Sequence, residues 1–266
     1  MTKTIGVIAI KGGVGKTTTV VNLGSVLAND FKKRVLIVDG NFSAPNLGLH
    51  IGVVDPKNTL HDVLTGKLPV TQAIYQHDHG FHFMPANLIH KKIDVYKLKQ
   101  KLHEVRNNYD VIVIDSSPNL NHEMLSTMVA SDELLVVSTP DYPTLSATMN
   151  AVRIAKQRRT PISGIVLNKV RNKRFELTMS DIEDATNTPI LAVLHDDIKV
   201  LEALSETMPY SMHSPNRNSA IEYKKLAGAL IGEKYNDSRF SSKIKRIFKS
   251  VHKPDVNRDV YRDNIQ

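Results

Sequence analysis

Short runs of apolar residues recur along the chain, and stretches with helical spacing separate them. The runs are rich in β-branched residues and apolar throughout, a pattern typical of strands that are buried on both faces of a sheet. Strands are predicted over residues 4–10, 34–39, 110–115, 133–138, 162–168 and 190–194. Helices are predicted over residues 16–29 and near residues 93–106, 120–130, 144–159, 178–186, 198–206 and 219–233. The alternation predicts an α/β fold, with a mostly parallel, twisted sheet covered by helices on both faces.

The composition becomes polar and charged after about residue 233, and this change divides the chain. Residues 1–233 show no internal repeat and no linker, so they are predicted to form one domain. Residues 234–253 are predicted to be a linker followed by a basic amphipathic helix, and residues 254–266 a disordered tail. A hydrophobic fraction of 41% and a charged fraction of 23% are ordinary for a globular protein.

The residue counts exclude several classes of protein. The chain has no cysteine, so it has no disulfide, no thiolate metal site and no cysteine nucleophile. We expect a cytoplasmic protein, because no secretory signal is visible and no apolar run approaches the roughly 18 residues of a membrane span. The formal net charge is +8, and residues 239–253 alone hold six basic residues and no acid. Such a local excess indicates a surface that docks an anionic partner.

The segment KGGVGKTT, residues 11–18, follows the first predicted strand and opens the first predicted helix. This context and spacing are those of a P-loop, in which backbone N–H groups and a helix N-terminus bind the phosphates of a nucleotide. Lys16 is expected to reach the β- and γ-phosphates, and the Thr17 hydroxyl to coordinate Mg²⁺. The predicted phosphate-binding residues are Gly12, Gly13, Val14, Gly15, Lys16, Thr17 and Thr18.

A second lysine, Lys11, stands at the start of the loop, where a P-loop needs only one. With this deviant Walker A motif, the sequence resembles the MinD/ParA family of P-loop ATPases over about residues 3–233. The segments "IDSSPNLNHEML" and "STPDYPTLSATMNAV" are most similar to its archaeal MinD-like branch. The resemblance implies ATP and Mg²⁺ as cofactors. It also implies an ATP-dependent homodimer in which Lys11 reaches across to the phosphate bound by the partner.

The family's metal-binding and switch positions follow in order. Asp39 ends RVLIVD, where the first switch of the family begins, and the following "NFSAPNLGLHIG" resembles the MinD switch. Asp115 ends DVIVID, as a Walker B carboxylate does. The resemblance implies that Thr17, Asp39 and Asp115 form the Mg²⁺ site.

Two further residues match positions on the adenine side of the family's site. Asn168 ends ISGIVLN and matches the asparagine that hydrogen-bonds adenine. In "AVLHDDIKVLEA", His195 and Asp196 stand where the family more often has proline and glutamate, so only Asp197 is carried over.

The sequence departs from the family at Asn41. In the family's switch a second aspartate, associated with positioning the attacking water, follows the first by two residues, whereas Asp39-Gly40-Asn41 has an amide there. An amide can hydrogen-bond a water, but it carries no charge and cannot accept a proton. We therefore expect slow hydrolysis unless a neighbouring group takes over this role. The predicted catalytic residues are Lys11, Lys16, Asp39 and Asn41.

The basic segment near the C-terminus has the pattern of an amphipathic helix. Its apolar residues, from Phe240 to Val251, fall at helical offsets of 0, 4, 7, 8 and 11, which form one stripe. A helix of this kind suits an anionic membrane interface, and MinD proteins carry a similar membrane-targeting helix. The alternative is a helix packed on its own domain. The predicted membrane-binding residues are Phe240, Lys243, Ile244, Arg246, Ile247, Phe248, Lys249 and Val251.

The function that this pattern favours is that of a MinD-like ATPase at the inner face of the cell membrane. It would take part in spatial positioning, in cell division or cargo placement, with an activating or cargo protein that the sequence does not identify. The alternative is a ParA-type DNA-segregation ATPase that binds nucleic acid through Lys/Arg clusters, such as the one within residues 169–174. A third alternative is a nucleotide-locked scaffold with little turnover.

Four histidines, His77, His79, His82 and His90, crowd one stretch. Imidazoles bind Zn²⁺ or Ni²⁺. However, no helical pair with an adjacent carboxylate is present, so a polar loop leading into a strand is predicted instead.

Overall fold

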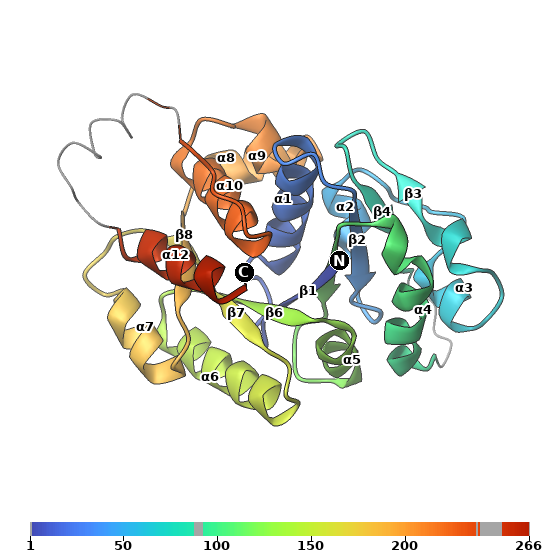
Figure 1. The fold of residues 1–266 in the computed structure, drawn as a ribbon, viewed down its shortest axis with the longest axis horizontal. Coiled ribbons are helices and arrows are strands. Elements are labelled where there is room, and N and C mark those ends of the chain that lie inside the picture. The colour runs from blue at the N-terminus through green and yellow to red at the C-terminus, as the bar shows by residue number, and fades with distance from the viewer. Residues whose placement is uncertain (1, 88–92, 238, 240–251, 266) are drawn as a thin grey trace.

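A sheet of eight strands runs through the centre of the molecule in the order β3-β4-β2-β5-β1-β6-β7-β8 (Figure 1). The computed structural model describes residues 2–87, 93–237, 239 and 252–265. Neighbouring strands in this part are parallel except β3 and β4, which confirms the predicted α/β class. The strands are β1 (Lys3–Ile8), β2 (Val35–Gly40), β3 (Tyr75–Gln76), β4 (His82–Met84), β5 (Val111–Ser116), β6 (Glu133–Ser138), β7 (Ile162–Val170) and β8 (Ile190–His195).

Helices cover both faces of the sheet, as predicted (Figure 1). One face carries α1 (Lys16–Asn29), α2 (Leu47–His50), α8 (Ile198–Ser205), α9 (Tyr210–His213) and α10 (Asn218–Leu230). The other carries α3 (Leu60–Leu64), α4 (Leu98–Val105), α5 (His122–Ala130), α6 (Tyr142–Gln157) and α7 (Met179–Thr186). Short 3₁₀ segments are η1 (Val70–Ala73), η2 (Val95–Lys97) and η3 (Arg106–Asn108), and the last helix is α12 (Lys253–Ile265).

The alternation of side chains along each strand explains why the strands are apolar throughout. In β2, Val35 and Ile37 join the cluster around α1, whereas Leu36 and Val38 join the cluster with α3 and α4. Successive side chains of a strand point to opposite faces, so a strand covered on both faces needs apolar residues at every position.

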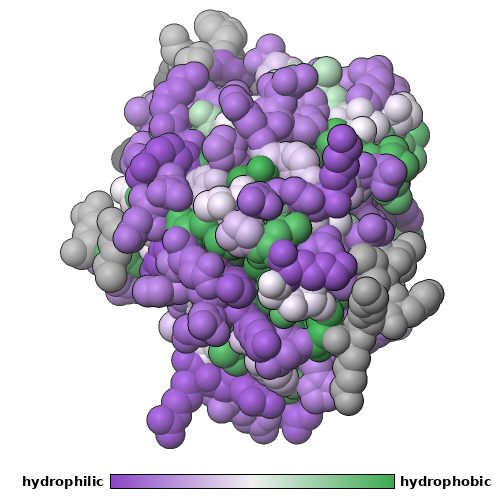
Figure 2. Space-filling view, turned by 90° about the vertical axis from the view of Figure 1, so that its right-hand side faces the viewer, coloured by the Kyte–Doolittle hydropathy of each residue, from purple (hydrophilic) through white to green (hydrophobic). Residues whose placement is uncertain are grey.

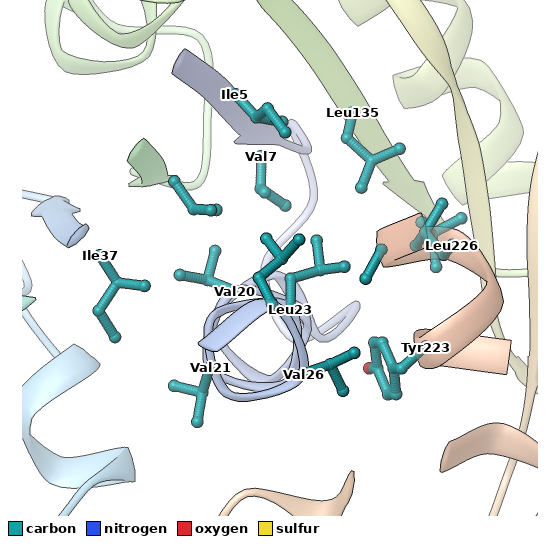
Figure 3. Close-up of a cluster of buried hydrophobic side chains, with 14 of the residues drawn as sticks. Ile5, Val7, Val20, Val21, Leu23, Val26, Ile37, Leu135, Tyr223 and Leu226 are labelled. Carbon is teal, nitrogen blue, oxygen red and sulfur yellow. The ribbon is translucent and has the colours of Figure 1, made fainter. Parts of the chain in front are cut away.

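The helix α1 is buried at the centre of one face. Its apolar residues pack between β1, β2, β6 and α10 (Figure 3). Gly24 allows this close approach, because a Cβ there would lie 2.7 Å from Ile37 Cγ2. The packing fixes the start of α1, and hence the KGGVGKTT loop, at the carboxyl end of the sheet.

The hydrophobic pattern did not predict the short elements. The strands β3 and β4 have two and three residues and contain polar side chains, so neither forms an apolar run. The helices α2, α3 and α9, with four or five residues each, are too short for a helical period to be recognised.

The prediction of disorder for residues 254–266 is wrong, because residues 253–265 form α12. This helix packs on β8 and α10, but its buried residues are only Pro254 and Arg258. The Arg258 side chain pairs with Glu222 at 2.9 Å and Asp255 at 2.5 Å, and it donates to the carbonyl of Leu191. Polar contacts therefore replace the apolar stripe that sequence analysis looks for.

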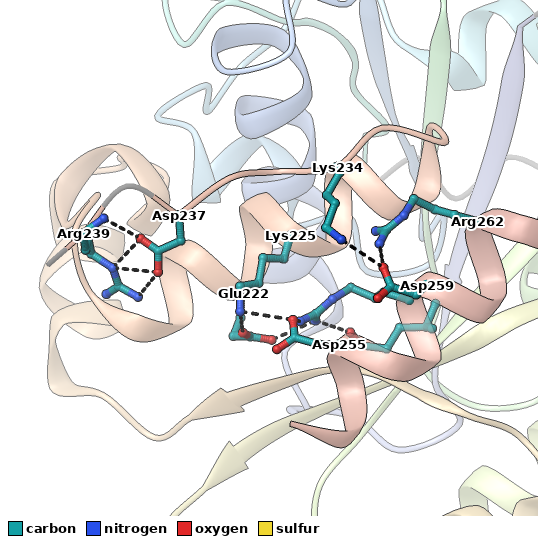
Figure 4. A network of polar contacts seen from close by, with 10 residues as sticks. Glu222, Lys225, Lys234, Asp237, Arg239, Asp255, Asp259 and Arg262 are labelled. Carbon is teal, nitrogen blue, oxygen red and sulfur yellow. Dashed lines mark hydrogen bonds and ion pairs between the residues drawn. The ribbon is translucent and has the colours of Figure 1, made fainter. Parts of the chain in front are cut away.

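Further ion pairs and hydrogen bonds fasten the chain on both sides of residues 240–251, which lie outside the described residues (Figure 4). On one side Arg239 pairs with Asp237 at 2.8 Å and donates to the carbonyl of Asn216. On the other side Tyr261 lies 2.9 Å from the Lys3 ammonium, which brings α12 next to the first strand.

No helix in the described ranges is both long and apolar enough to cross a bilayer. The side of the molecule that carries α3, α4 and β3 lies on the right in Figure 1. Its surface is mainly hydrophilic, with separate hydrophobic patches (Figure 2).

Replacement of Arg258 by alanine should lower the free energy of unfolding by about 3 kcal/mol, because it leaves buried acceptors without their cation. This loss of stability is at the low end of the roughly 3–5 kcal/mol expected when a buried ion pair is broken, because Lys225 still lies 3.3 Å from Glu222 and pairs with it. Urea unfolding measures it. Arg153→Ala, which removes an exposed arginine bonded to Asn150, is the matched control and should change stability little. Equal free energies for the two variants would contradict the role of Arg258.

Candidate nucleotide-binding site

Two glycines shape the loop between β1 and α1. Gly13 has a φ of 74° and Gly15 a φ of 97°, in the left-handed region that glycine adopts without strain. Gly15 also has no space for a side chain, since a Cβ there would lie 2.3 Å from Asn168 Nδ2. The loop thus turns directly into α1, whose first backbone N–H groups favour an anion.

Lys16 is the first residue of α1 and is buried. No hydrogen bond or ion pair to its ammonium group is formed by the residues that the structure describes. Burial lowers the pKa of Lys16, and the nearby Asp115 carboxylate opposes this shift. A phosphate group of a bound nucleotide would supply the negative partner that this buried ammonium group lacks among the described residues.

Two carboxylates lie side by side where β2 and β5 end. The parallel register sets Asp39 opposite Asp115, and both are 1% exposed. The Thr17 hydroxyl donates to Asp115 Oδ2 at 2.6 Å and also lies 3.0 Å from Asn46 Oδ1. The parallel sheet and the start of α1 therefore bring the three predicted Mg²⁺ residues together.

These three residues fit a magnesium site. Burial raises the pKa of both Asp39 and Asp115, and the charge of Asp115 raises that of Asp39 further. Asp115 Oδ1 is buried without a hydrogen-bond partner among the described residues. A divalent cation would supply the missing positive charge, and Mg²⁺ prefers oxygen ligands from one or two carboxylates together with nucleotide phosphates.

The backbone after β2 is folded around Asp39. Its carboxylate accepts hydrogen bonds from the N–H groups of Asn41 and Leu47, each at 3.1 Å. The side-chain amide of Asn41 donates to the carbonyl of Ala44, while Asn41 Oδ1 is buried and has no partner in the described chain. The unpaired oxygen can accept a hydrogen bond but cannot act as a base.

Lys11 lies away from the phosphate-binding turn of its own loop. Its ammonium group is 2.9 Å from Thr144 Oγ1 and 3.3 Å from Asp141 Oδ1, at the start of α6. The side chains of Lys11 and Asp141 are 44% and 43% exposed. Such a half-exposed pair contributes at most about 1 kcal/mol.

The sequence model of a family described as AAA domain matches residues 2–163, and relatives of this chain include MinD and ParA proteins. The chain belongs to the MinD/ParA family of P-loop ATPases.

Relatives and solved structures of this family cover most of the chain. An uncharacterized ATP-binding protein of Methanocaldococcus jannaschii is 33% identical over 254 residues, which are 90% of this chain and 95% of the relative. The chromosome partitioning protein ParA of Caulobacter vibrioides is 31% identical, over 83% of this chain and 91% of the relative. The septum site-determining protein MinD of Pyrococcus horikoshii, solved with Mg-ADP, superposes with a TM-score of 0.81 at 31% identity, over 86% of this chain and 95% of that chain.

Each of the two predicted adenine-side residues of this ATPase makes hydrogen bonds within the chain. The Asn168 amide donates to the carbonyl of Val14 at 2.8 Å, and the neighbouring Lys169 ammonium to the carbonyl of Gly13 at 2.8 Å. Both contacts join β7 to the phosphate loop. An adenine contact of Asn168 stays a prediction.

Asp197 is already satisfied inside the chain. It caps α8 by accepting from the N–H of Lys199 at 3.0 Å, and it pairs with Arg217 at 2.7 Å and Tyr210 at 2.8 Å. It also lines a cavity of about 540 Å³. The cavity is lined by His195, Asp196, Asp197, Ile198, Asn216, Arg217, Asn218 and Ser219. Asp197 therefore shapes this cavity, and its role toward a nucleotide stays a prediction.

The histidine stretch has a structural arrangement in the described residues. His77 and His79 lie in the turn between β3 and β4, with ring centroids 4.4 Å apart, and each bonds a backbone carbonyl, of Ile51 and Thr207 respectively. His90 lies outside the described residues. No cluster of three metal-ligating His, Cys, Asp or Glu side chains occurs in the ranges that the structure describes.

Sequence reasoning missed the residues that receive Lys11. Asp141 accepts from the N–H of Thr144 at 2.9 Å and so caps α6. The pattern Asp-Tyr-Pro-Thr is a helix start with proline in the first turn, and this was the available signal. This pattern predicts that Asp141 caps α6, but it does not predict that Lys11 also contacts Asp141.

Replacement of Lys16 by alanine should weaken ATP binding by about 100-fold, because charge-assisted hydrogen bonds to phosphate contribute up to about 3 kcal/mol. Isothermal titration calorimetry with Mg²⁺ and ATP measures the affinity. Lys156→Ala, at an exposed position on α6, is the control and should bind as the wild type does. Unchanged affinity in the Lys16 variant would contradict the assignment.

Proposed function

We propose that this chain is an ATP-dependent, dimerising ATPase of the MinD type that binds an anionic membrane surface and takes part in spatial positioning. The position of Lys11 supports this best. The lysine stands at the start of the phosphate loop, is half exposed, and makes its polar contacts with Asp141 and Thr144 at the start of α6. A cation so placed is free to pair with a phosphate held by a second copy of the chain.

In the proposed hydrolysis, Lys16 and the backbone N–H groups of the loop hold the β- and γ-phosphates. Mg²⁺, when bound at Thr17, Asp39 and Asp115, supplies positive charge next to these phosphates. Asn41 Oδ1 accepts a hydrogen bond from the attacking water, and Asp39 fixes the backbone on which Asn41 stands. Without a carboxylate at residue 41, we propose slow turnover and a long-lived ATP dimer.

Lys11→Ala should bind ATP with an affinity within about threefold of the wild type but should not form the ATP-dependent dimer. The reason is that Lys11 makes no contact inside its own phosphate-binding turn. Light scattering in the presence of a non-hydrolysable ATP analogue measures the mass. A variant that dimerises as the wild type does would show that Lys11 does not act across an interface.

We propose that the basic segment 240–251 binds the membrane. Its stripe of Phe240, Ile244, Ile247, Phe248 and Val251 lies outside the described residues, so the support comes from the sequence pattern. One such helix binds weakly, whereas two joined in an ATP dimer act together. The described contacts of Arg239 and α12 fasten the chain on both sides of the segment, so α12 has to be kept in any test.

Ile247→Glu should abolish the ATP-dependent sedimentation of the protein with anionic liposomes while ATP binding is retained, because it places a charge in the apolar stripe. Binding by the wild type should fall as salt is added. Val256→Glu is the matched control, since Val256 is an exposed apolar residue of α12 that lies outside the stripe. Equal pelleting of the Ile247 variant and the wild type would contradict membrane binding.

The same samples test the DNA-segregation alternative, which the ParA relative of Caulobacter vibrioides favours. Within the basic cluster, Lys169 and Arg171 are bonded to Gly13 and Asp196, whereas Lys173 and Arg174 are exposed. Salt-sensitive binding of duplex DNA with ATP, without liposome binding, would favour this alternative over the membrane. The activating or cargo protein is to be sought by pull-down with an ATP-trapped form.

Asn41→Asp should raise the steady-state rate of phosphate release by about 10- to 100-fold, because it restores a carboxylate next to the attacking water. ATP affinity should change little, since the residue serves the water and not the phosphates. The measurement is made with and without liposomes. A variant no faster than the wild type would show that the amide at residue 41 does not limit turnover.

A further inference from the structure

One buried acid, Glu123 in the first turn of α5, has no part in the site described so far. The residue is 8% exposed, although carboxylates are seldom buried without a partner. Its Oε1 accepts a hydrogen bond from the Ser43 hydroxyl, and its Oε2 is buried with no hydrogen-bond partner among the described residues. Burial of a carboxylate is costly when it is poorly satisfied, which indicates a role beyond packing.

The helix α5 lies directly against the segment that follows β2. Glu123 and Thr127 are four residues apart and share one face of α5. A Cβ on Gly40 would lie 3.0 Å from Thr127 Oγ1, so this face packs closely against the end of β2. Ser43 lies in the segment that follows Asp39, and Glu123 lies at the start of α5, shortly after Asp115 in the chain. The Ser43–Glu123 bond therefore links the two parts of the chain that carry the Mg²⁺-site carboxylates.

Unpaired polar atoms gather at this contact. In the part of the chain that the structure describes, six buried side-chain atoms have no hydrogen-bond partner, and four of them belong to these two segments and to α5. These four are Asn41 Oδ1, Asp115 Oδ1, Glu123 Oε2 and Thr127 Oγ1. Such atoms are few in native proteins, and each calls for an explanation, such as a catalytic role. Their grouping around the Ser43–Glu123 bond is the observation that the following proposal explains.

We propose that Glu123 is a positioning residue for ATP hydrolysis. Through Ser43 it holds residues 41–46 against α5, which keeps the Asn41 amide in place to accept a hydrogen bond from the attacking water. The proposal rests on the proposed ATPase function. In the reaction the water oxygen bonds to the γ-phosphorus as the bond to the β,γ-bridging oxygen breaks. ADP and phosphate form, and the protons of the water leave with phosphate and solvent.

The amide at residue 41 makes this support necessary. A carboxylate attracts the water by its full charge, whereas an amide oxygen carries only a partial charge and depends more on its exact placement to orient the water. Near Asn41 the segment is held by the two backbone hydrogen bonds to Asp39, by the turn that Asn41 itself forms with Ala44, and by the packing of the Phe42 ring against His61. The Ser43 hydroxyl ties it to α5, and the Thr17 hydroxyl of α1 contacts it at Asn46 Oδ1, 3.0 Å away.

The test uses the full chain with Mg²⁺ and ATP and compares Ser43→Ala, Glu123→Ala, the double variant and Glu123→Gln. Each alanine variant should lower the single-turnover rate about tenfold, with the dissociation constant for ATP within about twofold of the wild type. The double variant should be no slower than either single variant, because both remove one bond. Glu123→Gln should keep at least about half of the rate, since its amide oxygen still accepts from Ser43.

Amide hydrogen exchange of residues 41–47 with Mg-ADP bound is the second readout, and it does not depend on turnover. Exchange should rise in both alanine variants and stay unchanged in Glu123→Gln. Ser205→Ala, at an exposed serine whose hydroxyl bonds the Glu202 carbonyl, is the matched control. Unchanged rate and exchange in the alanine variants, or rate losses that add in the double variant, would overturn the proposal. A wild type without any hydrolysis would overturn the proposed ATPase, and exchange would still test the Ser43–Glu123 link.

Discussion

Unpaired charge buried at the carboxyl end of the sheet is the constraint on which the site depends. The pairing of β2 with β5 sets Asp39 opposite Asp115, and the start of α1 buries the Lys16 ammonium nearby. Buried charges are unfavourable unless a group of opposite sign completes them. A nucleotide with Mg²⁺ carries both signs, with phosphate for Lys16 and a cation for the two carboxylates. The fold thus places buried charges together whose partners of opposite sign a bound magnesium–nucleotide complex would supply.

Lys11 and the segment after β2 border this core and respond to its charge. Lys11 rests on Asp141 and Thr144, a half-exposed contact that little opposes its transfer to a phosphate of another copy. The segment after β2 is folded on the Asp39 carboxylate by two backbone hydrogen bonds and joined to α5 through Ser43. A change in the charge of the site therefore reaches this segment directly, through Asp39.

The central sheet and the phosphate loop could be predicted from the sequence because each depends on local order. Strands covered on both faces must be apolar at every position, and a glycine loop that ends in Gly-Lys-Thr between strand and helix is typical of a P-loop. The helix α12 could not be predicted, because it is held by Arg258 and its acidic partners. A search for apolar residues at helical spacing does not detect a helix that ion pairs hold in place. Asn168 shows a different limit. Its place near the end of β7 could be predicted, whereas its contact with the carbonyl of Val14 depends on how β7 and the phosphate loop meet.

The thermal unfolding of the wild type, compared with Mg-ATP, with ATP and EDTA, and with Mg²⁺ alone, tests the central claim most directly. Ligand at about 100 times its dissociation constant stabilises by about 2.7 kcal/mol, which for a chain of this size corresponds to roughly 5–10 °C in Tm. The account predicts such a rise with Mg-ATP, a clearly smaller one with ATP in EDTA, and almost none with Mg²⁺ alone. Equal rises with and without Mg²⁺, or no rise with Mg-ATP, would contradict the claim that the buried charges form a magnesium–nucleotide site.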